Sequence, residues 1–115
     1  MPDDKELPID GLDITEEELA ALKAKFGEIN LLEACDEQVL VRTPPYAEWQ
    51  RFFSMANDPD QRSNALDTLT RACIVYPDKA GVNKLLNLKP ALGVTFGNEI
   101  SELAGLAKKV SRKKL

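Results

Sequence analysis

Residues 73–78 read CIVYPD, and this stretch decides where one helix of the chain ends and the next begins. A proline pushes the residue before it out of the helical region, so Pro77 ends the helix that we predict before it. Asp78 is then well placed to cap a short helix that follows. Cys73 and Tyr76 share one apolar helix face, and the chain has no histidine that would activate the thiol. We therefore interpret the stretch as a junction between two helices.

Two further helices with apolar stripes flank this junction. Residues 46–56 carry much of the aromatic content of the chain at helical spacing, so we expect this helix to anchor the core. A last helix is predicted over residues 90–104, where apolar side chains again recur at helical spacing. Its Gly93 and Gly97 form a Gly-x-x-x-Gly pattern, which indicates that two backbones approach closely. We place this contact within the domain, and a contact between subunits is the alternative.

The first half of the chain predicts one helix and a β-hairpin. Thr15 and Glu18 form a capping box that opens a helix over residues 15–26. Two short apolar runs around a polar turn then predict a hairpin at about residues 28–43. The predicted fold class is α+β, mainly α, with the small hairpin packed against a bundle of about four to five short helices.

Length and composition favour a single domain. The chain has 115 residues, of which 43% are apolar and 30% charged, with a net charge of −4. We predict a flexible acidic arm over residues 1–14, one helical domain over 15–105 and a basic C-terminal tail over 106–115. The sequence contains neither an apolar run that could span a bilayer nor a signal peptide, so we expect a cytoplasmic protein with no membrane contact.

The residues that carry most enzyme chemistry are absent or scattered. Without histidine the chain lacks the commonest general base, and the two distant cysteines cannot complete a zinc site. Both cysteines have apolar neighbours, so we expect reduced thiols that pack as small apolar groups. No glycine-rich phosphate loop appears. We predict a non-enzymatic protein with no metal and no cofactor.

Charge is concentrated at the two ends of the chain. Residues 1–20 contain eight carboxylate side chains and one lysine. The tail carries five cationic side chains that are candidates for contact with a partner: Lys108, Lys109, Arg112, Lys113 and Lys114. Such a tail can bind phosphates, but it has no interleaved aromatic residues for base stacking, so nucleic acid is the less favoured partner.

The order of the motifs resembles that of the small tail assembly chaperones of long-tailed bacteriophages and prophages. The sequence runs VLVRTPPYAEWQRF, then ALDTLTRACIVYPDKAGVNKLL, then PALGVTFGNEISELAGL. In that family a strand ending in Arg-x-Pro leads into an aromatic helix, similar to residues 46–53. A helix then ends in a Cys-Val-x-Tyr-Pro-like motif, similar to residues 73–78. A Pro-Ala-Leu start opens the last helix, and the resemblance covers about residues 28–105.

This resemblance implies a chaperone that works by binding. Members of the family bind the long, apolar tape-measure protein before the tail tube polymerises, keep it soluble in the host cytoplasm and are absent from the finished tail. Two further interactions remain open: binding of the tail tube protein as a second partner, and assembly of this chain into a homo-oligomer. The resemblance assigns no binding residues to this chain.

A chaperone for an apolar helix needs exposed apolar surface. The candidate contact residues are Tyr46, Trp49 and Phe53 on the aromatic helix and Val94 and Phe96 on the last helix. The alternative for each of them is a place in the core. Two other functions remain open: a phage connector protein that stays in the virion, and a small nucleic-acid-binding regulator that acts through the basic tail.

Overall fold

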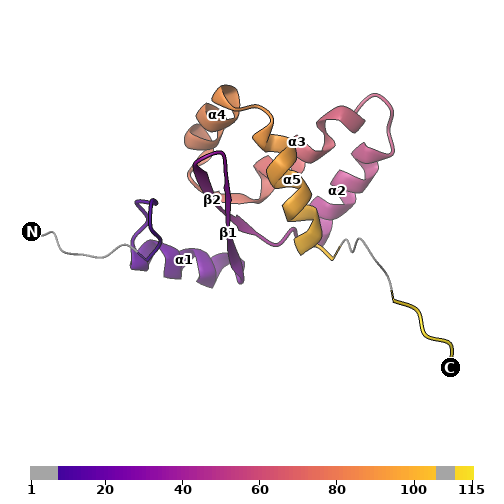
Figure 1. Ribbon diagram of the computed structural model, residues 1–115, viewed down its shortest axis with the longest axis horizontal. Coiled ribbons are helices and arrows are strands. Elements are labelled where there is room, and N and C mark those ends of the chain that lie inside the picture. The colour runs from indigo at the N-terminus through magenta and orange to yellow at the C-terminus, as the bar shows by residue number, and fades with distance from the viewer. Residues whose placement is uncertain (1–7, 106–110) are drawn as a thin grey trace, which may run out of the picture.

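The fold is a small three-stranded sheet with helices around it, and the computed structural model describes residues 8–105 and 111–115. Within these residues the helices are α1 (Glu16–Phe26), α2 (Tyr46–Ala56), the 3-10 helix η1 (Arg62–Asn64), α3 (Ala65–Cys73), α4 (Lys79–Leu88) and α5 (Leu92–Leu103). The strands are β1 (Ile29–Ala34), β2 (Glu37–Arg42) and β3 (Ile74–Tyr76). The expected class, mainly helical α+β, is confirmed. Helices α1 and α2 lie toward opposite ends of the molecule, with the sheet between them (Figure 1).

Helix α1 begins where the sequence predicts it. The Thr15 hydroxyl accepts a hydrogen bond from the Glu18 amide at 3.1 Å, and the Glu18 carboxylate accepts one from the Thr15 amide at 2.9 Å. This reciprocal pair satisfies two amide groups that the first turn of a helix leaves without partners. The helix ends at Phe26, and Gly27 follows it with a φ of 82°, which favours glycine.

The hairpin is tight, and its turn consists of Cys35 and Asp36. Strands β1 and β2 are antiparallel, and Ala34 pairs with Glu37 across the turn. Both turn residues have positive φ, 52° and 64°, as a two-residue turn needs in order to match the twist of the strands. The hairpin is therefore confirmed, although it lacks the Asn-Gly pair that usually forms such turns.

A third strand follows α3 directly, and the sequence analysis did not predict it. The helix ends at Cys73, and β3 then pairs antiparallel with β2, so that the sheet order is β1-β2-β3. The prediction that Tyr76 extends the helix face is wrong. Ile74, Val75 and Tyr76 are β-branched or aromatic residues that favour strands, and Pro77 keeps the residue before it out of the helical region. Asp78 caps α4 as predicted, accepting a hydrogen bond from the Gly81 amide at 2.9 Å.

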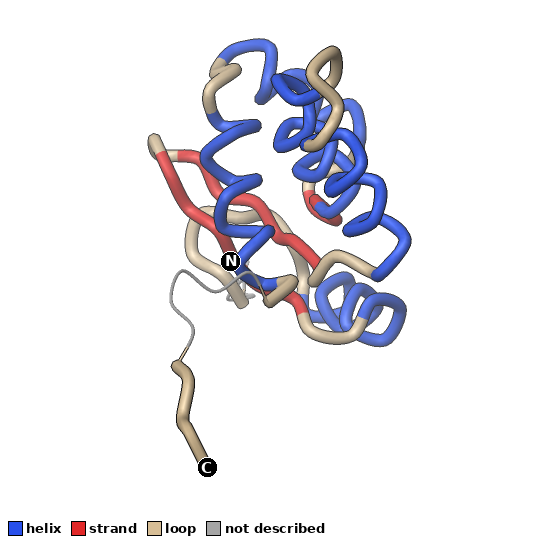
Figure 2. The backbone as a smooth tube through the Cα atoms, turned by 90° about the vertical axis from the view of Figure 1, so that its right-hand side faces the viewer, coloured by secondary structure: helices blue, strands red, loops and turns tan. Residues whose placement is uncertain are grey.

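The two faces of the sheet support two separate apolar clusters. On the central strand β2, Val39 and Val41 join the main cluster with α3, α4 and α5, whereas Leu40 joins a smaller cluster. Figure 2 shows most of the helices gathered along one side of the strands, with a single helix apart from them. Leu12 and Ile14 fill the smaller cluster and are 8% and 0% exposed. Residues 1–7 of the predicted flexible arm over residues 1–14 lie outside the described residues. Leu12 and Ile14 do not fit a flexible arm, because they pack against the sheet.

Helices α3 and α5 pack closely against each other. A Cβ atom added at Gly97 would lie 2.8 Å from the Leu66 carbonyl oxygen and 2.9 Å from the Thr70 hydroxyl oxygen, and one added at Gly93 would overlap the Asp67 carboxylate. The buried Thr70 hydroxyl donates to the carbonyl oxygen of Gly93 or of Leu66. The close backbone approach predicted from the two glycines is thus confirmed within the domain.

The two cysteines have different environments. Cys73 is 0% exposed in the main cluster, and burial raises the pKa of its thiol to about 11. Cys35 is exposed in the hairpin turn, where its carbonyl oxygen accepts a hydrogen bond from Lys89 Nζ at 2.7 Å. The expectation of a packed apolar thiol is therefore correct for Cys73 and wrong for Cys35, because a residue at the tip of a hairpin has no core to enter.

We predict that Gly97→Ala destabilises the protein by about 1–3 kcal/mol, the usual cost of overpacking. The added methyl group would collide with backbone of α3, which cannot move aside as a flexible side chain can. Urea denaturation followed by circular dichroism measures the change. Asn98→Ala, at an exposed position on the same helix, is the control. A Gly97→Ala protein as stable as wild type, or more stable, would contradict the close contact, since alanine is the better helix former.

We predict that native protein at about pH 8 exposes one fast thiol to Ellman's reagent, and that Cys35→Ser removes it. A thiol with a pKa near 11 is ionised in about one molecule in a thousand at that pH, and Cys73 is also shielded from the reagent. The second equivalent should react only after denaturation. Two fast equivalents in the native protein would show that Cys73 is accessible.

Candidate partner-binding surface

Helix α2 presents aromatic side chains to solvent. Tyr46 and Phe53 are 74% and 60% exposed, and Trp49 is half-buried between them. A shallow cavity of about 370 Å³ lies on this side of the helix. We call the residues that line it the α2 surface: Tyr46, Trp49, Gln50, Phe53 and Ser54. The Gln50 amide donates a hydrogen bond to the Tyr46 hydroxyl at 3.0 Å. Three of the predicted contact residues thus come together on one helix.

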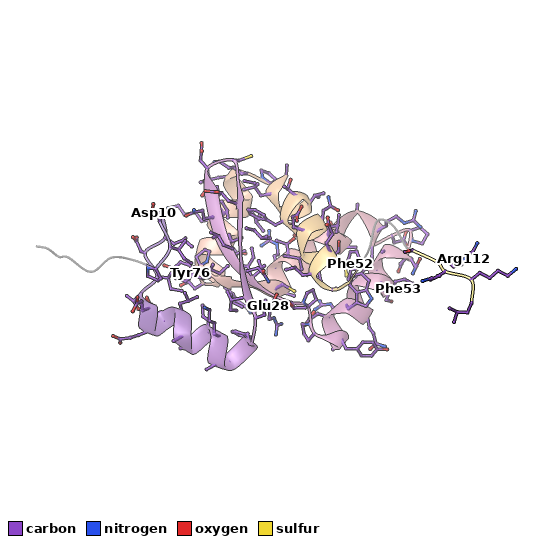
Figure 3. All side chains as sticks on the ribbon, turned by 60° about the horizontal axis from the view of Figure 1, so that its bottom comes forward. Asp10, Glu28, Phe52, Phe53, Tyr76 and Arg112 are labelled. Carbon is purple, nitrogen blue, oxygen red and sulfur yellow. The ribbon has the colours of Figure 1, made fainter. Side chains whose placement is uncertain are left out.

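The other side of α2 holds the helix to the domain. Phe52 is half-buried and packs against the main cluster, and its ring centre lies 5.1 Å from that of Trp49. Successive helix residues are about 100° apart around the axis, so Phe52 and Phe53 point in different directions (Figure 3). No residue of α2 is buried. The expectation that this helix anchors the core is wrong, because Phe96 on α5 is the largest fully buried side chain among the described residues.

The two predicted contact residues on α5 separate. Val94 is 45% exposed, whereas Phe96 is 1% exposed and belongs to the main cluster. Residues two positions apart lie on nearly opposite sides of a helix, so both cannot face the same partner. The prediction that Phe96 is a contact residue is therefore wrong, because its side chain is in the core. Val94 remains exposed, but it does not line the cavity of the α2 surface.

The basic tail lies partly outside the described residues. Arg112, Lys113 and Lys114 are exposed and belong to no helix or strand. Lys108 and Lys109 fall outside the described residues. The structure therefore brings none of the tail side chains that it describes into the α2 surface.

Besides the terminal Leu115, sequence reasoning missed two exposed apolar side chains. Leu31 on β1 is 43% exposed, and Leu88 at the end of α4 is 73% exposed. Each is a single apolar residue, which is ordinary on a protein surface. Sequence reasoning also missed Gln50 and Ser54, which complete the α2 surface, because polar residues on an aromatic helix give no apolar pattern.

Arg42 on β2 is a half-buried cation beside Cys73. Its Nη2 donates a hydrogen bond to the Ala72 carbonyl oxygen at 3.1 Å, and its Cζ lies 5.3 Å from the centre of the Phe26 ring. Among the described residues its buried Nε has no hydrogen-bond partner. The guanidinium acts to lower the pKa of the Cys73 thiol, but burial outweighs it and the pKa is raised. This group joins β2 to α3 and α1.

Titratable side chains on and around β3 affect one another. Partial burial, followed by the charges of Glu18, Asp13 and Asp78, raises the pKa of the Tyr76 hydroxyl. Within residues 8–105 and 111–115 there is no cluster of three or more His, Cys, Asp or Glu side chains that could hold a metal ion. In that same part of the chain, no helix has the length and apolar character needed to cross a membrane.

Comparison with known proteins gives one solved structure of similar fold. An uncharacterised protein, rbstp2171 of Bacillus stearothermophilus, is 22% identical with a TM-score of 0.67. The match covers 83% of this chain and 99% of the other, and at this identity it shows a shared fold. No curated protein matches the chain. The family model of the domain of unknown function DUF6848 matches residues 22–113, from within α1 into the basic tail. The chain therefore belongs to the DUF6848 family.

Proposed function

We propose that this protein is a non-catalytic chaperone of phage tail assembly, which binds the tape-measure protein and keeps it soluble before the tail tube assembles. The observation that carries the proposal is the α2 surface, where Tyr46 and Phe53 stand exposed on either side of Trp49. The order of the sequence motifs, which resembles that of tail assembly chaperones, supplies the identity of the client.

The α2 surface suits one side of an apolar helix. Tyr46 and Phe53 are seven residues apart, about 10 Å along the helix axis, so they can contact two successive turns of a client helix. Such a helix lays the apolar side chains of its i, i+3, i+4 and i+7 positions into a shallow groove. Tyrosine and tryptophan are also among the residues that contribute most to binding energy at interfaces.

The surface also restricts the chemistry of its client. None of the five residues that line its cavity carries a charge. A charged client side chain buried there would lose its hydration without gaining an ionic partner, which is unfavourable. The contacting side of the client is therefore apolar, as expected for the long helical tape-measure protein.

The binding must also be reversible, since a chaperone releases its client. Full burial of a large apolar side chain contributes about 1.5–3 kcal/mol, and Tyr46 and Phe53 still have most of their surface to bury. A contact made by two such residues is strong enough to shield a client that presents many similar sites. It is also weak enough to be replaced when the tail tube protein polymerises around the client.

We predict that co-expression with the tape-measure protein of the same phage or prophage raises the soluble yield of that protein, and that Tyr46→Ser combined with Phe53→Ser abolishes the increase. Both side chains are exposed, so the double variant should fold with the thermal stability of wild type. The measurement is the soluble fraction of the tape-measure protein and its co-purification with the chaperone.

Leu88→Ser is the matched control, because it removes an equally exposed apolar side chain from a different helix. This control should support the client as wild type does. An unchanged yield with the wild-type protein would count against the proposed function. A double variant as effective as wild type would place the client elsewhere on the protein.

A further inference from the structure

A second cavity lies on the opposite side of α2 from the α2 surface. It has a volume of about 600 Å³, within the range of small-molecule sites, and its walls come from α2, α3, β3 and α4. In Figure 1, α3 lies between α2 and α4. The apolar part of its lining is formed by Ala72, Ile74 and Val82. None of the residues of the α2 surface contributes to it.

Cationic side chains dominate the polar part of the lining. Arg51, Arg71 and Lys79 line the cavity together with one carboxylate, Glu48. Arg51 Nη1 lies 4.0 Å from Glu48 Oε1, at the outer limit of an ion pair. The side chain of Lys79, at the start of α4, has no ion pair or hydrogen bond with any residue that the structure describes. The positive charge of Lys79 is therefore available to a ligand.

Arg71 is held in place between two helices. Its Nε donates to the Asp67 carboxylate at 2.7 Å and its Nη1 donates to the Asn83 side-chain oxygen at 2.6 Å. The bond to Asn83 joins α3 to α4 beside the cavity, the bond to Asp67 lies within α3, and together they hold the guanidinium before any ligand arrives. Arg51, Arg71 and Lys79 carry positive charges, of which Glu48 neutralises that of Arg51 and Asp67 that of Arg71. The positive charge of Lys79 therefore remains uncompensated.

We infer that this cavity binds a small organic monoanion, a carboxylate carried on an apolar body. The apolar wall would cover the body of such a ligand, and Lys79 and Arg51 would pair with its charge. Thr68 also lines the cavity, and its hydroxyl would be a further donor for the carboxylate. The single excess positive charge favours a monoanion over a dianion. This site is separate from the proposed function and does not depend on it.

Nuclear magnetic resonance titration of the full chain with octanoate tests the inference. Octanoate should cause saturable shifts, fitted by one site, in the amide signals of Thr68, Ala72 and Val82. The uncharged analogue 1-octanol should bind more weakly. Lys79→Gln and Arg51→Gln should each weaken octanoate binding about threefold to fivefold, as expected for a partly exposed ion pair. Lys84→Gln, on α4 outside the cavity, should leave it unchanged.

Three results would overturn the inference. One is the absence of saturable shifts through the millimolar range. Another is shifts centred on Gln50 and Ser54, which would assign the ligand to the α2 surface. The third is equal binding of octanoate and 1-octanol, because the cationic side chains would then contribute nothing. Arg51 and Lys79 are exposed, so their substitution should leave the protein folded, and circular dichroism of the two variants should confirm this.

Discussion

The close contact between α3 and α5 fixes the arrangement of the other elements. It exists because Gly93 and Gly97 have no side chains to keep the backbones apart, and because the Thr70 hydroxyl has a carbonyl partner on the facing helix. Helix α3 passes directly into β3, so its position also sets the strand that completes the sheet beside β2. Helix α5 places Phe96 and Ile100 in the main cluster. This helix pair therefore positions both β3 and the α5 side chains of the main cluster.

This arrangement leaves α2 attached on one side and free on the other. The core is already filled from α3, α4, α5 and β2, and α2 contributes only the half-buried Phe52 to it. Tyr46 and Phe53 then have no interior to enter and remain exposed. The α2 surface is thus a consequence of a core that closes without the aromatic helix. Exposed aromatic residues on a firmly packed scaffold are what a binding protein for an apolar client requires.

The sequence predicts the local features of the fold well, because these depend on residues close together in the chain. The capping box at Thr15, the hairpin and the cap at Asp78 are of this kind. The glycine pattern predicts a close backbone contact for α5, but not that the partner is α3, where Thr70 lies 23 residues before Gly93. The third strand was missed because the three residues after Cys73 also continue the apolar pattern of α3. Whether they form helix or strand depends on the free edge of β2, which lies more than 30 residues earlier in the sequence.

The candidate sites were harder to predict than the fold. Helical spacing shows which side chains share a face, but not whether another element covers that face. For this reason Phe53 and Phe96 are both plausible contact residues in the sequence, yet only Phe53 is exposed. The cationic cavity could not be predicted at all, since its walls come from four elements whose proximity follows from the tertiary packing.

Trp49 offers the most direct test of the central claim, that the client binds on the exposed side of α2. It is the only tryptophan in the chain and it lines the cavity of the α2 surface. The measurement is its fluorescence during titration with a soluble, tryptophan-free fragment of the tape-measure protein. We expect a shift of the emission to shorter wavelength and weaker quenching by acrylamide as the client covers the ring. A fragment that binds while the emission and quenching of Trp49 stay unchanged would contradict the account.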